Sequence, residues 1–208
     1  MEKIEFDKPT LILASNSPRR ARKFSEVGLN FVQMVSEVDD SALNDDFAHD
    51  GVSKRQEKQY AKSMALAKIQ PFIGKVKNGA VVTADTTVLC EGRVLEKPIT
   101  KEKCRENHEF ISGKTAYTHN AMAVYYNGRT LCMVEIIKVK FAKIPSDVID
   151  RICDEPETLD MAGYNRRGIV KEYVTNNART SMGISIPHVI KMLKKLKFPI
   201  DAIQAGKK

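Results

Sequence analysis

The chain has 208 residues, of which 42% are hydrophobic and 29% charged, and its formal net charge is +8. These values are typical of a globular protein with one sizeable core or two small lobes. No apolar run approaches the roughly 20 residues of a membrane-spanning helix, and the charged N-terminal residues argue against a secretory signal. We therefore expect a cytoplasmic protein, and the positive charge favours an anionic partner.

The first predicted unit is a strand, a small polar loop and a helix. Leu11–Leu13 is a short apolar run of strand type, and Ser17 followed by Pro18 is typical of a helix start. Gly28 suits the left-handed residue that ends a helix. Three apolar side chains share the face of this helix that we expect to be buried: Ala21, Phe24 and Val27.

The start of this helix carries groups that suit an anion. Unpaired backbone N–H groups and the helix dipole attract negative charge there before any side chain is counted. Ser15 and Ser17 add hydroxyl donors, and Arg19 and Arg20 add two guanidinium groups. The pattern favours a polyphosphate site, and the alternative is a solvated surface helix with an incidental arginine pair.

An acidic stretch follows the next predicted strand, which spans Phe31–Val38. Glu37, Asp39 and Asp40 either form a solvated loop or supply oxygen ligands for Mg²⁺, which binds one or two carboxylates together with phosphate oxygens and water.

Asp85 interrupts a strand that is otherwise apolar and β-branched. The preceding helix is predicted over Ser53–Gln70, and the strand spans Ala80–Cys90. Aspartate is disfavoured in such a strand, and a buried carboxylate needs a partner, a proton or a metal. Asp85 is therefore either a general base or metal ligand, or an outward-facing side chain satisfied by Thr86 and Thr87.

The second half of the chain continues to alternate helices and strands, which indicates the α/β class with some antiparallel hairpins. Asn127-Gly128 between two β-branched runs is a strong hairpin signal. The predicted elements are a helix over 100–111, strands over 121–126 and 130–141, a helix over 146–154 capped by Ser146, a polar loop over 160–167, a strand over 168–174 and a helix over 187–196. We expect one domain over 1–208 with a basic tail from about residue 198.

The cysteines and histidines do not form a recognisable metal motif. Cys90, Cys104, Cys132 and Cys153 are too widely spaced for a zinc pattern. We expect reduced and mostly buried thiols.

Four segments carry a resemblance to a known family. ASNSPRR at 14–20 fits an S-x-S-x-R-R signature, SEVDDS at 36–41 an acidic segment, TADTTV at 83–88 an A-D-T segment, and EKP at 96–98 a K-P segment. With these motifs the chain resembles, over about residues 11–196, the Maf family of nucleoside triphosphate pyrophosphatases, also called septum-formation inhibitors.

The resemblance implies a fold and an activity. The fold would be an elongated mixed sheet with flanking helices and two lobes around a central cleft, related to the inosine triphosphatase group. The activity would be hydrolysis of a nucleoside triphosphate, such as dTTP, UTP or a modified nucleotide, to the monophosphate and pyrophosphate. It also implies a divalent cation, Mg²⁺ or Mn²⁺, and suggests a homodimer.

The resemblance also assigns roles to residues. Asp85 would activate water and bind the metal, with Asp39 as the second carboxylate. Arg19 and Thr86 would tune base selectivity, and Lys97 joins Asp85 as a catalytic candidate. The candidate triphosphate-binding residues are Ser15, Ser17, Arg19, Arg20 and Lys97.

Two lysines of the family pattern are missing, and Tyr164-Asn165-Arg166-Arg167 stands where the family has tyrosine, glycine, isoleucine and glutamine. Met64 stands where the second helix of the family has a lysine before alanine, and Met161 replaces the lysine of its D-K-A-G segment. Losing two charge-assisted contacts would weaken triphosphate binding strongly. We hypothesise that neighbouring cations compensate: Arg166 or Arg167, together with Lys62 or Lys68.

Two other functional classes remain as alternatives. A nucleotide-binding regulator without turnover is favoured by Met64 and Met161. A nucleic-acid-binding module is favoured only by the net charge, and the chain has no P-loop motif. We expect a nucleotide substrate, no membrane and no specific nucleic acid as partners.

Overall fold

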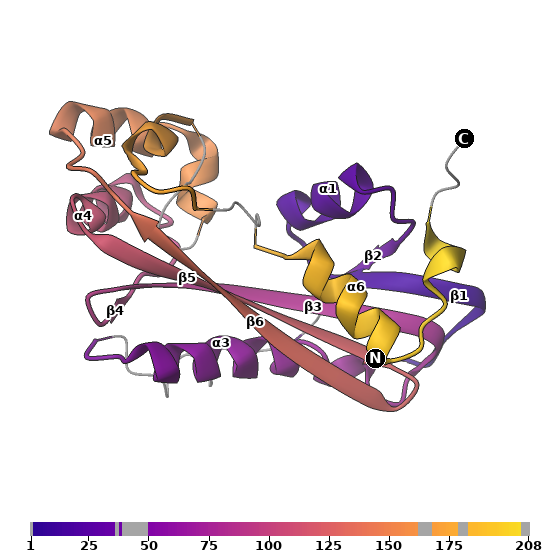
Figure 1. Ribbon diagram of the computed structural model, residues 1–208. Helices are drawn as coiled ribbons and strands as arrows, with labels where there is room; N and C mark the ends of the chain where they lie inside the picture. Colours follow the sequence, from indigo (N-terminus) through magenta and orange to yellow (C-terminus); the bar gives the residue numbers. More distant parts are fainter. Residues whose placement is uncertain (1, 36–37, 39–49, 162–167, 179–182, 205–208) are drawn as a thin grey trace.

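The computed structural model describes residues 2–35, 38, 50–161, 168–178 and 183–204. Its centre is a mixed six-stranded sheet in the order β2-β1-β3-β5-β6, with β4 paired to β3 (Figure 1). β1 runs parallel to β2 and β3, whereas β3 pairs antiparallel with β4 and β5, and β5 pairs antiparallel with β6. The strands are β1 (Ile4–Ala14), β2 (Val32–Met34), β3 (Val76–Cys90), β4 (Arg93–Val94), β5 (Thr115–Tyr126) and β6 (Arg129–Lys140).

Helices cover both faces of the sheet. α3 lies along one face, α1 and α6 lie on the other, and α4 and α5 pack together at one end (Figure 1). The α-helices are α1 (Pro18–Glu26), α3 (Lys54–Ala67), α4 (Lys101–Ile111), α5 (Ser146–Cys153) and α6 (Ile186–Lys195). The 3-10 helices are η1 (Gln70–Phe72), η2 (Pro156–Asp160), η3 (Gly168–Tyr173) and η4 (Ile200–Ile203). This arrangement confirms the α/β class with a mixed sheet and flanking helices.

Several element ends follow signals in the local sequence. Ser53 and Gln56 form a capping box at the start of α3, and the Thr100 side chain accepts a hydrogen bond from the Lys103 backbone N–H at the start of α4. Asn127 and Gly128 both have positive φ between β5 and β6, as a two-residue hairpin turn of type I′ requires.

Other local predictions are wrong. Gly168–Tyr173 forms a 3-10 helix rather than a strand, because its fully buried Val170 packs against α5 instead of extending the sheet. Ser146 is the first helical residue of α5, and Pro145 occupies the cap position. Ser17 does stand at the N-cap of α1, but its side chain caps none of the described N–H groups of that helix.

The prediction of reduced thiols is also wrong for two of the four cysteines. Cys104 of α4 and Cys153 of α5 form a disulfide with Cα atoms 5.8 Å apart. Cys90 and Cys132 are free. Because the bonded cysteines are 49 positions apart, their spacing carries no signal for the bond.

None of the helices within the described ranges combines the length and apolar character that crossing a membrane requires.

We predict that Phe24 is the main apolar anchor of α1. Phe24 is fully buried and packs edge-to-face on Phe31, whereas Val27 is 50% exposed, contrary to the expected apolar face. Phe24→Ala should lower the free energy of unfolding by about 3 to 5 kcal/mol because it opens a core cavity. Val27→Ala, at the C-cap of the same helix, should change it by less than about 0.5 kcal/mol. Urea unfolding of both variants checks this, and equal losses would contradict it.

Candidate functional site

The candidate site lies where β3 continues past the end of β1. β1 ends at Ala14, whereas β3 continues to Cys90, so Asp85 and Thr86 lie beyond the last β1 pairing, Leu13 with Val82. Alternation along the strand directs Asp85 toward α3 and Thr86 toward α1. The chain after β1 turns beside them, which brings the start of α1 to this edge.

Arg20 connects the start of α1 to two other segments. Its Nε donates to the Gly183 carbonyl at 3.2 Å, Nη1 to Ser15 Oγ at 3.2 Å and Nη2 to Thr86 Oγ1 at 3.4 Å. Thr86 Oγ1 donates in turn to Asn120 Oδ1 on β5 at 3.1 Å. Burial lowers the pKa of Arg20, and the negative charge of nearby Asp85 opposes this shift. Arginine stays protonated at neutral pH, so the network fixes one positive charge.

Gly183 is required where it meets Arg20. Its φ of +78° is left-handed, and a Cβ there would lie 3.1 Å from Thr86 Oγ1. A side chain at this position would therefore disturb both partners of the arginine.

Arg19 and Lys97 share one carboxylate. Lys97 Nζ lies 2.7 Å from Asp160 Oδ1, and Arg19 Nη2 lies 3.5 Å from Asp160 Oδ2 and donates to the Asp160 carbonyl at 3.1 Å. Burial alone would raise the pKa of Asp160, but the hydrogen bond and charge of Lys97, with that of Arg19, lower it below its usual value. The Asp160 side chain is 62% exposed, so these pairs are open to competition by a solute anion.

Lys68 supplies a cation at the other side of the site. Its Nζ lies 2.5 Å from Asp85 Oδ1, and the two side chains are only 24% and 13% exposed. Lys68 follows Met64 by four residues and therefore lies on the same face of α3, one turn farther along. Lys68, one of the two compensating lysines we hypothesised, thus reaches the candidate base.

Three other residues were hypothesised to replace the charge lost at Met64 and Met161: Lys62, Arg166 and Arg167. Lys62 is exposed and lies near Cys132 of β6, where burial raises the pKa of the thiol to about 11 and the lysine charge opposes this. Lys62 is therefore not part of the cluster. Arg166 and Arg167 lie outside the described residues, as does the predicted metal ligand Asp39.

Both methionines that depart from the family pattern are buried. Met64 is 6% and Met161 9% exposed. They pack as apolar side chains and offer no charge to an anion.

The cluster carries a net positive charge among the described residues. Four cations and two carboxylates meet there, which leaves two positive charges in excess: Arg19, Arg20, Lys68, Lys97, Asp85 and Asp160. The sequence predicts Asp160 only as part of a polar loop and assigns it no role in the site. Asn120 is not predicted at all, because its strand carries no motif. The arrangement can bind a polyanion next to a half-buried carboxylate.

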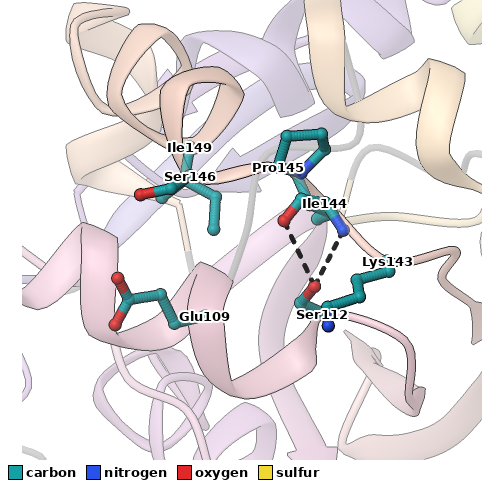
Figure 2. A pocket seen from close by; sticks show the side chains of 7 residues that line it. All are labelled: Glu109, Ser112, Lys143, Ile144, Pro145, Ser146 and Ile149. Atoms are coloured by element: carbon teal, nitrogen blue, oxygen red, sulfur yellow. Dashed lines mark hydrogen bonds between the residues drawn. The ribbon is translucent and has the colours of Figure 1, made fainter.

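A separate pocket lies away from this cluster, between the end of α4 and the start of α5 (Figure 2). It is lined by Glu109, Ser112, Lys143, Ile144, Pro145, Ser146 and Ile149. It contains none of the predicted site residues, and its charged lining residues are one acid, Glu109, and one base, Lys143. It is therefore not part of the candidate site.

The fold and the cluster define an α/β protein with a positively charged edge, and comparison with known proteins identifies the family. The family model for Maf-like proteins matches residues 10–196. The chain belongs to the Maf family.

Named relatives match nearly the whole chain. A dTTP/UTP pyrophosphatase of Bacillus anthracis (strain CDC 684 / NRRL 3495) is 30% identical over 94% of this chain and 98% of its own length. A dTTP/UTP pyrophosphatase of Neisseria meningitidis serogroup B is 26% identical over the same shares. A solved structure of a HAM1 protein from Coxiella burnetii is 14% identical, with a TM-score of 0.37, and covers 86% of this chain and 88% of that one.

We predict that the planar fork of Arg20 cannot be replaced by a point charge. Arg20→Lys loses hydrogen bonds to acceptors on three segments and should lower the free energy of unfolding by about 1 to 3 kcal/mol. Arg22→Lys, at an exposed position of the same helix, should be nearly neutral. Urea unfolding measures both, and a neutral Arg20→Lys would show that the network does not stabilise the fold.

Proposed function

We propose that the protein hydrolyses nucleoside triphosphates to the monophosphate and pyrophosphate. The observation that carries the proposal is the half-buried Asp85 carboxylate beside four cations at the end of β1. The names of its relatives, dTTP/UTP pyrophosphatases, support the same reaction and favour dTTP, UTP or modified nucleotides as substrates.

The cations suit a triphosphate because attack at its α-phosphorus needs charge neutralisation more than covalent chemistry. Arg20 is already oriented by Ser15 and Thr86. Arg19 and Lys97 would exchange the exposed Asp160 carboxylate for phosphate oxygens. Ser15 lies at the turn into α1, where its hydroxyl accepts from Arg20 and from the Ser17 backbone N–H.

Asp85 is the described carboxylate placed to orient and deprotonate the attacking water. Lys68 holds its Oδ1, which fixes the carboxylate in orientation, and its second oxygen, Oδ2, would accept from the water. A carboxylate so placed acts as a general base by accepting the proton of the nucleophile as the bond to phosphorus forms.

The donor chemistry also fits a divalent cation. Mg²⁺ binds one or two carboxylates together with substrate phosphates and water, and Asp85 supplies one carboxylate next to the cations that would hold the phosphates. Asp39 is proposed as the second. A bound Mg²⁺ or Mn²⁺ would neutralise phosphate charge and lower the pKa of a bound water.

The reaction is tested by pyrophosphate release from a panel of common and modified nucleoside triphosphates. We expect turnover that requires Mg²⁺ or Mn²⁺, is lost with EDTA, and falls at least about 100-fold in Asp85→Asn. Asp201→Asn, an exposed aspartate in η4, should keep full activity. If the triphosphates stay intact but still raise the melting temperature of the protein, the result would support the alternative of a nucleotide-binding regulator. Salt-dependent retention of the protein on DNA or RNA would support the alternative of a nucleic-acid-binding module.

Lys68 should matter for turnover although it lies at the C-cap of α3, four residues after the position where the family pattern has its lysine. Lys68→Met keeps the aliphatic stem but removes the charged hydrogen bond to Asp85, so kcat should fall about 10- to 100-fold. Lys58→Met, an exposed lysine of the same helix, is the matched control. Steady-state kinetics with melting temperatures as a folding check would decide, and an unchanged kcat would contradict the role.

The two arginines of the loop are proposed to complete the charge lost at Met161. Alanine at both Arg166 and Arg167 should raise KM for the triphosphate about tenfold or more. Unaltered KM and kcat in the double variant would remove them from the site.

A further inference from the structure

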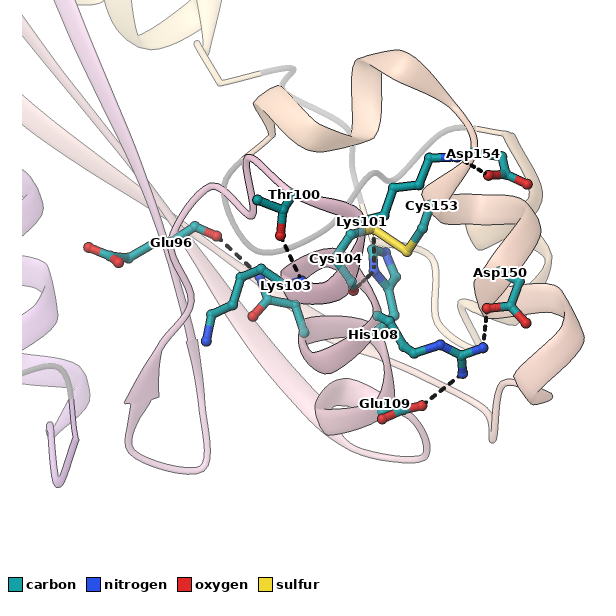
Figure 3. Close-up of a disulfide and its surroundings, with 12 residues drawn as sticks. Glu96, Thr100, Lys101, Lys103, Cys104, His108, Glu109, Asp150, Cys153 and Asp154 are labelled. Atoms are coloured by element: carbon teal, nitrogen blue, oxygen red, sulfur yellow. Dashed lines mark hydrogen bonds and ion pairs between the residues drawn. A yellow bond between two sulfur atoms is a disulfide. The ribbon is translucent and has the colours of Figure 1, made fainter.

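The disulfide lies inside a seam between α4 and α5. Around Cys104 and Cys153, ion pairs join the two helices (Figure 3): Lys101 Nζ lies 2.6 Å from Asp154 Oδ1, and Arg105 pairs with Asp150. The four charged side chains are at least 37% exposed, and exposed pairs of this kind contribute little to stability. The covalent bond is therefore the strongest link in the polar part of the seam.

The same seam leads to the charged cluster. Lys97 precedes Cys104 by seven residues, and Asp160 follows Cys153 by seven. Between them, the Ile99 backbone N–H donates to the Leu159 carbonyl at 3.1 Å. The two segments that bear the Lys97–Asp160 pair are thus connected both near the pair and at the disulfide.

His108 adds a second unusual feature at the disulfide. Its Nδ1 lies 2.7 Å from the Cys104 carbonyl oxygen and 3.4 Å from Cys104 Sγ, while Nε2 is buried without a hydrogen-bond partner among the described residues. Burial lowers the pKa of this histidine, against the opposing effect of the carbonyl. Because a carbonyl oxygen only accepts, Nδ1 carries the proton of the neutral ring, and this N–H lies beside Cys104 Sγ, where it can stabilise the thiolate that leaves when the disulfide opens.

We propose that Cys104 and Cys153 form a thiol–disulfide exchange site, open to a dithiol reductant or a disulfide oxidant, and that its oxidation state sets how firmly Lys97 is held for the triphosphate. The second half of this proposal rests on the proposed function. The first half does not depend on it.

The exchange balances as an ordinary two-step reaction. A reductant thiolate attacks Cys153 Sγ, the bond to Cys104 Sγ breaks, and Cys104 leaves as a thiolate that takes up a proton. The second thiol of the reductant then displaces Cys153, so the dithiol is oxidised to a disulfide and the two cysteines gain two electrons and two protons. Because Cys104 is fully buried and Cys153 is 4% exposed, attack needs a local opening of the seam.

A metal ion is the competing occupant of this place. Ligand atoms of Cys104, His108 and Cys153 lie within 4.8 Å of one another. A metal needs thiolates, however, and the sulfur atoms are bonded to each other. The test therefore includes metal analysis.

Thiol counting and melting temperatures test the exchange site. After treatment with oxidised glutathione, denaturing alkylation and mass analysis should find two free thiols, those of Cys90 and Cys132, and four after dithiothreitol. Reduction should lower the melting temperature by roughly 5 to 15 °C. The double variant Cys104→Ser/Cys153→Ser should show no such shift, whereas Cys132→Ser should keep it. Four free thiols in the oxidised sample, or stoichiometric zinc bound by the protein, would overturn the proposal.

Substrate affinity tests the connection to Lys97. Reduction should raise KM for the triphosphate roughly tenfold, as expected for the loss of one charge-assisted contact, with kcat changed less than about twofold. The double variant should show the high KM under both conditions. A non-hydrolysable triphosphate analogue should show the same change in Kd, which separates this outcome from a failure of hydrolysis. An oxidation state that alters neither KM nor Kd would overturn the connection.

Discussion

The early end of β1 is the constraint on which the site depends. Parallel strands usually extend side by side, but here β3 runs on beyond Ala14, and the chain turns at once into α1. The loop between β1 and α1 is held in place by the Gln33 side chain, which donates to the Ser15 carbonyl at 2.7 Å. Three features therefore meet at one edge of the sheet: backbone polar groups, the start of α1 and the side chain of Asp85. They come from different segments of the chain.

Arg20 converts this edge into a rigid site. A guanidinium group has donors in a fixed plane, and three of them are used on segments far apart in the chain. The loop before α1, the strand β3 and the turn at Gly183 cannot move independently while these bonds hold. The hydrogen bonds of Arg20 thus fix its donors in place before a ligand binds. A site that is ordered in advance avoids the entropic cost of ordering side chains on binding.

Local signals in the sequence predicted much of this arrangement. Capping at Ser53 and Thr100 and the turn at Asn127-Gly128 depend on a few adjacent residues, so they could be seen directly. The motif residues Ser15, Arg19, Arg20, Asp85 and Lys97 came from spacing and resemblance, and their described side chains lie along the same edge.

What the sequence did not predict depends on contacts between distant segments. The disulfide joins residues 49 positions apart, and its partners follow only from how α4 packs on α5. Gly168–Tyr173 has the composition of a strand, but burial of Val170 beside α5 outweighs that preference. Lys68 was one of two candidate lysines, and only the position of α3 against β3 brings it to Asp85.

The exposures of the two carboxylates explain how one site can hold charge and still receive an anion. Asp160 is 62% exposed, and its pairs with Lys97 and Arg19 are solvent-screened, so they are weak. Asp85 is 13% exposed, and its pair with Lys68 lies in a less polar environment where a lone charge would be costly. Under the proposed function, an arriving triphosphate competes with Asp160 for Lys97 and Arg19 and leaves the Lys68–Asp85 pair intact. On that function, the exposed pair would keep the cations ordered between turnovers, and the Lys68–Asp85 pair would keep the base in place during them.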